Sequence, residues 1–510
     1  MSKKFAWLVV SIFLVSSAKG QSSPPNIFDV LMSSATYNPA GGPAGVVPSI
    51  FTETKVSTVL GSATFGSTVT NATNYSVSSN LVQLNNSLNV GIASALSIIP
   101  LSSPASGVIV RTDPATGAEL PESSTLGPIL SERAETIGKR KLFLGISHQD
   151  FHFTKYNGTS LNSLSILYSG GAASQILTSQ GATGLTAVPA TFNIGMDVRL
   201  SQDIALLTYG LTDRIDVSVG LPMIHAGVQA RTYNGLIYAG TGFGNPTCWC
   251  VNTFTPGSPT LELPQIGNSS LSKTGIGDLL FRVKGSVIHK RNVVVAVGAD
   301  VRLPTGDAQN YLGTGTTSFK PFAAVSLYSK PVKKSVVFSP HFDAGWQISG
   351  QSILGGGLQP TSVTENTAAG PVNYLAAPFT STKDYLPDVF AWTVGAEVAV
   401  GRRTTFIADI LGNQIGWIHG VPDTMVQSIT GVSLPTGVNG DSTNTATPTI
   451  GTATGLVSAG RVSYGQYSGS FGYKARIAGK LVANFNVLVR FDNNGLVAKF
   501  VPEYGLGYTF

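Results

Sequence analysis

The C-terminal segment of this chain alternates apolar and polar residues with a period of two. From residue 497 to 510, one set of alternate positions is rich in aromatics and ends at Phe510, whereas the other contains Lys499, Glu503 and Thr509. This alternation predicts a β-strand with one face in an apolar medium and the other in a polar one. A soluble protein rarely exposes such a strand at a sheet edge, because an open edge templates aggregation. A closed barrel has no open edge, so the pattern favours an outer-membrane β-barrel.

The same alternation recurs upstream and predicts further strands. They lie at 141–153, 191–209, 215–232, 275–288, 293–303, 319–329, 338–346, 392–400, 404–415, 462–478 and 481–491. Short, often basic connections alternate with long Gly/Ser/Thr-rich ones, as periplasmic turns and external loops do in such barrels. Two less regular segments, 105–112 and 120–135, flank a turn sequence at 113–117 and predict two more strands. We therefore expect an all-β fold, a transmembrane antiparallel β-barrel of about 14 strands at residues 105–510.

The N-terminal region has the pattern of an export signal. Residues 1–20 combine a basic start, a short apolar run and small residues at the expected cleavage site, which predicts a signal peptide. The apolar run is too short to span a bilayer comfortably, which disfavours an uncleaved anchor. Residues 21–104 are rich in Ser, Asn and Thr, and we expect either a plug inside the barrel or a periplasmic extension. The expected location is the outer membrane of a diderm bacterium.

Composition narrows the possible partners. Charged residues are only 11% of the chain, against about a quarter in typical soluble domains, which suits a lipid-facing surface. The net charge of +6 is spread over short basic turns, and no basic face of a recognised nucleic-acid module is found, so we expect no nucleic acid. The expected partners are outer-membrane lipid, a small hydrophobic ligand, and the outer-membrane assembly machinery, which would recognise the C-terminal strand ending at Phe510.

The loop 233–270 contains both cysteines, as Cys248-Trp249-Cys250. An exported chain favours oxidation, so we expect a local disulfide, although a bridge across one residue is strained. Free thiols or a metal site are the alternatives, but the scattered histidines give no zinc pattern. We expect no metal and no other cofactor. The aromatics Phe243, Trp249 and Phe254 are candidates for an apolar pocket that receives substrate, or they only pack the loop.

If the aromatic-rich faces contact lipid, the opposite faces line the lumen. The charged residues on those faces are Asp197, Arg199, Asp216, Asp278, Arg282, Lys284, Asp300, Arg302, Asp343, Glu397, Asp409, Arg490, Lys499 and Glu503. Acids and bases are close in number, which favours a structural ion-pair network over a charged ring that selects ions. An enzyme is disfavoured, because His341 lies beside Asp343 on an inward face but has no Gly-x-Ser-x-Gly motif nearby.

Several short motifs resemble those of a known family. They lie at 126–139 followed by 144–149, at 210–214 with 220–222, at 275–278 with 282–284, and at 302–307 with 312–315. Over residues 105–510 the chain resembles the outer-membrane transporter family named for the meta-pathway of phenol degradation, which is related to the long-chain fatty acid outer-membrane transporters. The resemblance implies a barrel that passes small hydrophobic compounds inward across the outer membrane.

The leading hypothesis is therefore passive uptake of small hydrophobic or aromatic compounds. The alternatives are a general diffusion porin for polar solutes and a non-transporting surface or adhesion barrel. A porin needs an open, polar, water-filled bore, whereas paired lumenal charges and an N-terminal plug favour a closed one.

Overall fold

The computed structural model describes most of the chain from residue 79 onward. The described residues are 79–99, 110–112, 119–121, 125–162, 164–168, 190–233, 237–239, 250–252, 265–290, 292–329, 336–367, 370–401, 403–416, 425–433, 449–456 and 463–510. The predicted signal peptide, residues 1–20, lies outside this set.

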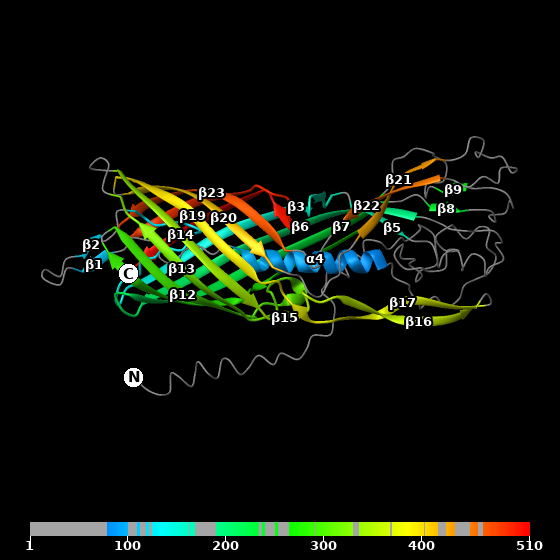
Figure 1. Cartoon of the computed structure of the whole chain (residues 1–510), viewed down its shortest axis with the longest axis horizontal. Helices are drawn as coiled ribbons and strands as arrows, with labels where there is room; N and C mark the ends of the chain where they lie inside the picture. The colour runs from blue at the N-terminus through cyan, green and yellow to red at the C-terminus, as the bar shows by residue number, and fades with distance from the viewer. Residues whose placement is uncertain are drawn as a thin grey trace, which may run out of the picture.

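Twelve antiparallel strands form a closed barrel wall (Figure 1). In wall order they are β3 (Leu142–Tyr156), β6 (Ala190–Gly210), β7 (Ile215–Tyr233), β10 (Gln265–Ile276) continuing as β11 (Leu279–Lys290), β12 (Val293–Leu303), β13 (Ser318–Leu327), β14 (Val336–Ser349), β19 (Val389–Val400), β20 (Thr404–Ile415), β23 (Tyr464–Ala478), β24 (Leu481–Arg490), and β25 (Leu496–Ala498) continuing as β26 (Phe500–Thr509). The wall closes where β26 pairs with β3, with Tyr504 opposite His148. The twelve strands from residue 141 onward that alternation predicts are confirmed.

The two strands predicted before residue 141 are not part of the wall. Strands β1 (Val110–Thr112) and β2 (Glu119–Pro121) pair only with each other, and residues 125–137 form no strand. Residues 125–137 are buried, so their apolar side chains face the lumen rather than lipid. The wall therefore has twelve strands rather than fourteen and begins at Leu142 rather than near residue 105.

Further short elements occupy the long connections at the barrel end opposite the C-terminus (Figure 1). They are β4 (Thr159–Ser160), β5 (Leu164–Tyr168), β8 (Ile237–Ala239), β9 (Cys250–Asn252), the 3-10 helix η1 (Ala308–Asn310), and the two-stranded sheets β15 (Gln351–Ser352) with β18 (Asp384–Tyr385), β16 (Leu358–Thr367) with β17 (Gly370–Ser381), and β21 (Met425–Ser433) with β22 (Thr449–Leu456). Long connections are external in such barrels, so this is the outer end and the C-terminus lies at the periplasmic end.

The outer surface of the wall carries an apolar belt. Large hydrophobic side chains are exposed on most wall strands, among them Ile146, Leu207, Met223, Val283, Val297, Phe342, Val394, Ile410, Phe471, Phe485 and Leu506. Exposed apolar residues in this number are stable only in lipid, and a closed barrel satisfies its backbone hydrogen bonds there. Among the described helices, none is both long and apolar enough to cross a membrane. The protein is an outer-membrane β-barrel.

The wall extends well beyond the bilayer on its outer side. Strand β6 has 21 residues, about twice the 9–11 that a tilted strand needs to span the hydrocarbon core. In its periplasmic half Leu207 and Tyr209 face outward. In its outer half the polarity of the two faces is reversed, because the inward Met196 and Val198 are apolar while the outward Arg199 is charged and exposed. The outer half thus resembles a soluble protein, apolar within and polar without.

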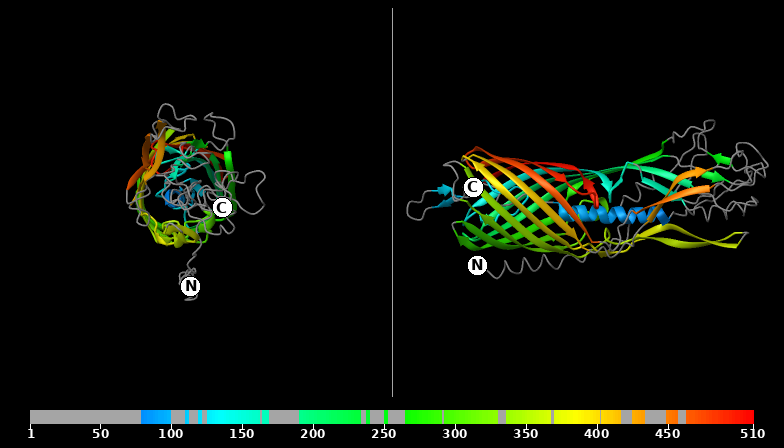
Figure 2. Two further views of the ribbon diagram at one scale, coloured as in Figure 1. Left: turned by 90° about the vertical axis from the view of Figure 1, so that its right-hand side faces the viewer. Right: turned by 45° about the horizontal axis from the view of Figure 1, so that its top comes forward.

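Helix α4 (Ser79–Ile98) fills the outer half of the barrel (Figure 2). It contains no charged residue, and Leu84, Leu88, Ile92 and Leu96 pack against the inward apolar side chains of β3, β6 and β7 in one core. A helix that is buried all round has no solvent-facing side for charge, which explains its composition. At Gly91 a Cβ atom would lie 2.6 Å from the Tyr156 ring, so only glycine permits this approach.

Polar contacts fix the helix at both its sides and its end. The Tyr311 hydroxyl donates to Asn89 Oδ1 at 2.6 Å, and the Tyr156 hydroxyl donates to the Ser87 carbonyl oxygen at 2.9 Å. Near the C-terminal end of α4, Arg302 Nη1 donates to the Leu96 carbonyl oxygen at 2.8 Å. A cation at a helix C-terminus also interacts favourably with the helix dipole. Part of the N-terminal region predicted as plug or extension, residues 79–99, therefore lies inside the barrel.

Candidate functional site: a lumenal cavity between α4 and a plug segment

An irregular stretch of chain crosses the lumen on the periplasmic side of α4. We call residues 125–137 the plug segment. Because it forms no helix or sheet, its backbone groups need side-chain partners from the wall. Those contacts are Leu126 N to Thr405 Oγ1 at 3.1 Å, Ala134 N to Ser326 Oγ at 3.1 Å, Ile137 N to Asp216 Oδ2 at 2.9 Å, and Lys474 Nζ to the Pro128 carbonyl oxygen at 2.5 Å. Four wall strands thereby hold the segment.

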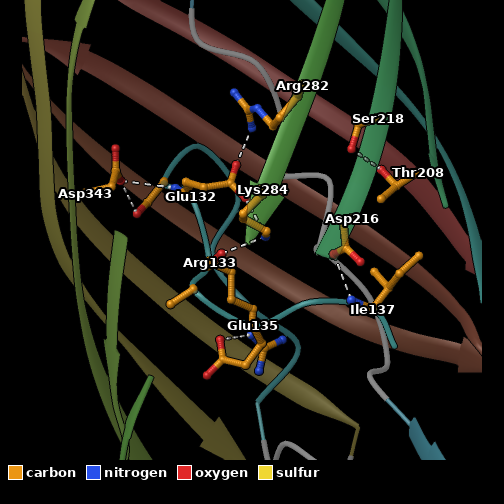
Figure 3. Close-up of polar contacts among 12 residues, drawn as sticks. Glu132, Arg133, Glu135, Ile137, Thr208, Asp216, Ser218, Arg282, Lys284 and Asp343 are labelled. Atoms are coloured by element: carbon orange, nitrogen blue, oxygen red, sulfur yellow. Dashed lines mark hydrogen bonds and ion pairs between the residues drawn. The ribbon is translucent and has the colours of Figure 1, made fainter. Parts of the chain in front are cut away.

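Glu132 is the centre of the charged contacts between the plug segment and the wall (Figure 3). Its carboxylate accepts from Arg282 Nη1 and, at 2.8 Å, from Lys284 Nζ. Arg282 also binds Asp300 through two parallel hydrogen bonds, at 2.6 Å from Nε and 2.7 Å from Nη2. All four side chains are buried, so each charge depends on its partners for the interactions that water would supply.

The residues on either side of Glu132 are fixed as well. Asp343 of β14 accepts from Ser131 Oγ at 2.6 Å and from the Glu132 backbone N–H at 3.1 Å (Figure 3). On the other side, Arg133 Nε donates to Glu135 Oε2 at 3.0 Å, and the Tyr328 hydroxyl donates to Glu135. Burial by itself lowers the pKa of Arg133, but the neighbouring oxygens of Tyr328 and Glu135 outweigh it and the pKa is raised. The plug segment therefore keeps a permanent buried cation.

A second buried cluster lies in the wall beside the plug segment. His341 Nε2 lies 2.8 Å from Asp409 Oδ1, and His341 Nδ1 lies 3.7 Å from Glu397 Oε1. All three residues are inward and buried, but none lines the cavity described next.

A cavity of about 150 Å³ lies between the C-terminal end of α4 and the plug segment. On one side it is lined by an apolar arc of the wall, which we define as Phe151, Phe153, Leu488, Leu496 and Val501. On the other side it is lined by a polar arc, which we define as Arg282, Asp300, Arg302, Lys320 and Asp343. Cavities of this volume in protein cores accept benzene-sized molecules. The site is therefore suited to a small ligand with an apolar part.

Most predicted lumenal charges do face inward. Asp216, Asp278, Arg282, Lys284, Asp300, Glu397, Asp409, Arg490 and Glu503 are buried inside the wall, and Arg302 and Asp343 are half-buried there. They do not form one network. Asp278 binds backbone N–H groups of the 304–317 loop, at Gly306 and Thr314, rather than a cation. Arg490 binds Asp492, and Glu503 accepts from Asn486 Nδ2 at 3.4 Å.

Three of the predicted lumenal charges were placed wrongly. Asp197 and Arg199 lie on the outside of β6, paired with each other at 3.1 Å, because the outer half of that strand is apolar inside and polar outside. Lys499 is exposed and donates to the Arg490 carbonyl oxygen at 2.7 Å. It falls between β25 and β26, where the interruption of the strand shifts the inward–outward phase.

Sequence reasoning also missed residues that matter. Glu132, Arg133 and Glu135 were assigned to a wall strand at 120–135, where no lumenal role was considered. The signal that could have identified them is their density, since three charges within four residues suit neither face of a membrane strand well. That composition is typical of a buried segment that binds charged partners.

The predicted loop pocket lies outside the described residues. This applies to Phe243, Trp249, Phe254 and Cys248, while for Cys250 only the backbone is placed, at the start of β9. The pocket and the disulfide between Cys248 and Cys250 remain predictions.

Comparison with known proteins gives only distant structural likenesses. The sequence matches no protein-family model and no curated protein. An outer-membrane channel from Pseudomonas putida F1 is similar at 11% identity with a TM-score of 0.36, over 74% of this chain and 98% of that one. A Pseudomonas aeruginosa FadL homologue has 8% identity and a TM-score of 0.27, over 81% and 98%. The CymD monoaromatic hydrocarbon channel has 11% identity and a TM-score of 0.26, over 81% and 97%. Identities and TM-scores this low carry no argument, so the fold assignment rests on the strand pairings of the barrel itself.

Proposed function

We propose that this barrel is an outer-membrane channel for the passive uptake of small hydrophobic or aromatic compounds. The observation that carries the proposal is the benzene-sized cavity in the lumen, with its apolar arc on one side. Helix α4 closes the lumen on the outer side of the cavity, and the plug segment crosses it on the periplasmic side. The motif resemblance to the family named for the meta-pathway of phenol degradation supports the same reading.

The alternatives fit the lumen less well. A general diffusion porin needs a continuous polar bore, but here an uncharged helix packs into an apolar core within the wall. A barrel that serves only adhesion has no need of an internal cavity with a ligand-sized volume. Catalysis is not proposed, because His341 is enclosed by Asp409 and Glu397 and does not line the cavity.

Two predicted partners belong to this proposal. The apolar belt contacts outer-membrane lipid, and the assembly machinery would recognise the C-terminal strand, whose last residue, Phe510, donates its backbone N–H to the Leu142 carbonyl oxygen at 2.7 Å. The aromatics of the loop 233–270 would provide the external entrance.

The proposal is tested by comparing solutes of different polarity. Cells whose lipopolysaccharide-bearing outer membrane limits entry should take up toluene and phenol faster when they contain the protein, and arabinose no faster. The purified barrel should show low conductance in a planar bilayer. Large steady conductance together with arabinose entry would reject the proposal in favour of a general porin, and no change for any solute would favour a non-transporting barrel.

A further inference from the structure

The two arcs of the cavity lie on opposite sides of the barrel. The polar arc comes from β11, β12, β13 and β14, which are consecutive in the wall. The apolar arc comes from β24, β25, β26 and β3, which are also consecutive and lie across the lumen from the first group. A small ligand between them meets apolar side chains at one end and charged groups at the other, so the cavity favours an amphipathic molecule over a bare hydrocarbon.

The polar arc contains a cation whose hydrogen-bond donors are not used. Lys320 is half-buried on β13 and makes no hydrogen bond or ion pair with any residue that the structure describes. The carboxylates of Asp300 and Asp343 interact with it electrostatically. Asp300 already accepts two hydrogen bonds from Arg282, and Asp343 already accepts from Ser131 and the Glu132 backbone. The ammonium of Lys320 therefore has three donors available to the cavity.

A second cation stands beside Lys320. Asp300 is opposite Lys320 and Arg302 is opposite Ser318 in the pairing of β12 with β13, so Arg302 and Lys320 are diagonal neighbours on the inward face. One nitrogen of Arg302 binds the Leu96 carbonyl oxygen, and the guanidinium has further donors. Both residues line the cavity. Two neighbouring cations with free donors, facing an apolar arc across the cavity, form an anion-binding end.

We propose that the cavity binds a small aromatic carboxylate, with its carboxylate on Lys320 and Arg302 and its ring against Phe151 and Phe153. This inference rests on the proposed function and adds the charge of the substrate to it. Lys320 supplies the specificity, because its ammonium is the group without a protein partner in the polar arc. A neutral ring of the same size would fill the apolar end but leave the hydrogen-bond donors of that ammonium unused.

Equilibrium dialysis of the folded, full-length barrel in detergent tests the inference, with protein-free micelles as the blank. The probes are radiolabelled benzoate, phenol and toluene at pH 7.5. The variants are Lys320→Met, which removes the charge and keeps the length, and Lys320→Arg, which keeps the charge. Lys290→Met is the matched control, because Lys290 is exposed at the end of β11 and does not line the cavity. A heat-modifiable gel band verifies that each variant is folded.

The wild type and Lys290→Met should bind benzoate more tightly than phenol or toluene. In Lys320→Met the affinity for benzoate should fall about tenfold or more while the affinity for toluene changes less than about twofold, since a charge-assisted hydrogen bond is worth at least that factor. Lys320→Arg should restore most of the benzoate affinity. The inference is wrong if benzoate and toluene fall together in Lys320→Met, if phenol falls as much as benzoate, or if benzoate affinity does not change. Absence of binding for all three probes, with no uptake by cells, would instead reject the proposed function.

Discussion

Replacing Glu132 by Gln should release the plug segment without unfolding the barrel. The carboxylate accepts from both Arg282 and Lys284, and Arg282 keeps Asp300 as a partner after the change. A Gln amide has one acceptor oxygen and presents N–H donors to a buried cation, so Lys284, only 2% exposed, loses the carboxylate to which it is hydrogen-bonded. Removing one partner of a buried ion pair costs about 3–5 kcal/mol. Since about 1.4 kcal/mol is a tenfold change, undocking of the segment becomes roughly a hundred to a few thousand times more favourable.

Planar-bilayer recording measures this change directly. Glu132→Gln should give frequent openings of larger conductance than the wild type, while its heat-modifiable gel band is unchanged because the wall ladder is intact. Adding Lys284→Met should suppress the openings in part, because it removes the unpaired ammonium. The control is Asp203→Asn, which breaks the exposed pair with His148 on the outer surface, and such pairs are worth about 1 kcal/mol or less. If Glu132→Gln conducts like Asp203→Asn, the ion pairs of Glu132 do not hold the segment.

Three further predictions follow from individual contacts. Gly210→Ala should lower the folded fraction on a heat-modifiable gel, because the new Cβ would lie 1.9 Å from the Gly138 carbonyl oxygen. An unchanged folded fraction would show that the two backbones are not this close. Tyr311→Phe should weaken the docking of α4 by about 1 kcal/mol, seen as roughly fivefold faster amide exchange in the helix, whereas unchanged exchange would show that the hydroxyl is dispensable. Alkylation before and after reduction, read by mass spectrometry, should find Cys248 and Cys250 protected only before reduction; two thiols alkylated at once would exclude the disulfide.

The wall could be predicted from the sequence because lipid enforces a regular pattern. Every wall strand crosses the same apolar belt, so a residue such as Phe485 must point outward while its neighbour Asn486 points inward. The rule fails where the surrounding medium changes. In the outer half of β6 water replaces lipid outside and α4 replaces water inside. Asp197 and Arg199 therefore lie on the outer surface and not in the lumen, although the predicted alternation was correct.

The interior was less predictable, because its partners are distant in sequence. The contact between Glu132 and Lys284 joins residues 152 positions apart, and no local pattern specifies it. Helix α4 was missed for a different reason. Its many Asn and Ser residues have weak helix propensity and resemble a polar linker, yet Asn89 and Ser87 bond to tyrosines of the surrounding structure. Tertiary burial, rather than local preference, stabilises that helix.

The reversed polarity of the outer half has a consequence for how the protein is assembled. The inward side chains of β3 and β6 there, such as Phe153 and Val198, would be left facing an empty lumen if α4 were absent. The last strand, β26, closes the ring against β3. Because Gly91 packs so closely against Tyr156, we expect the helix to be in place before the last strand pairs with the first. The order of synthesis, with the helix ahead of every wall strand, makes that sequence of events available, and a circularly permuted chain with the helix at its end should close poorly.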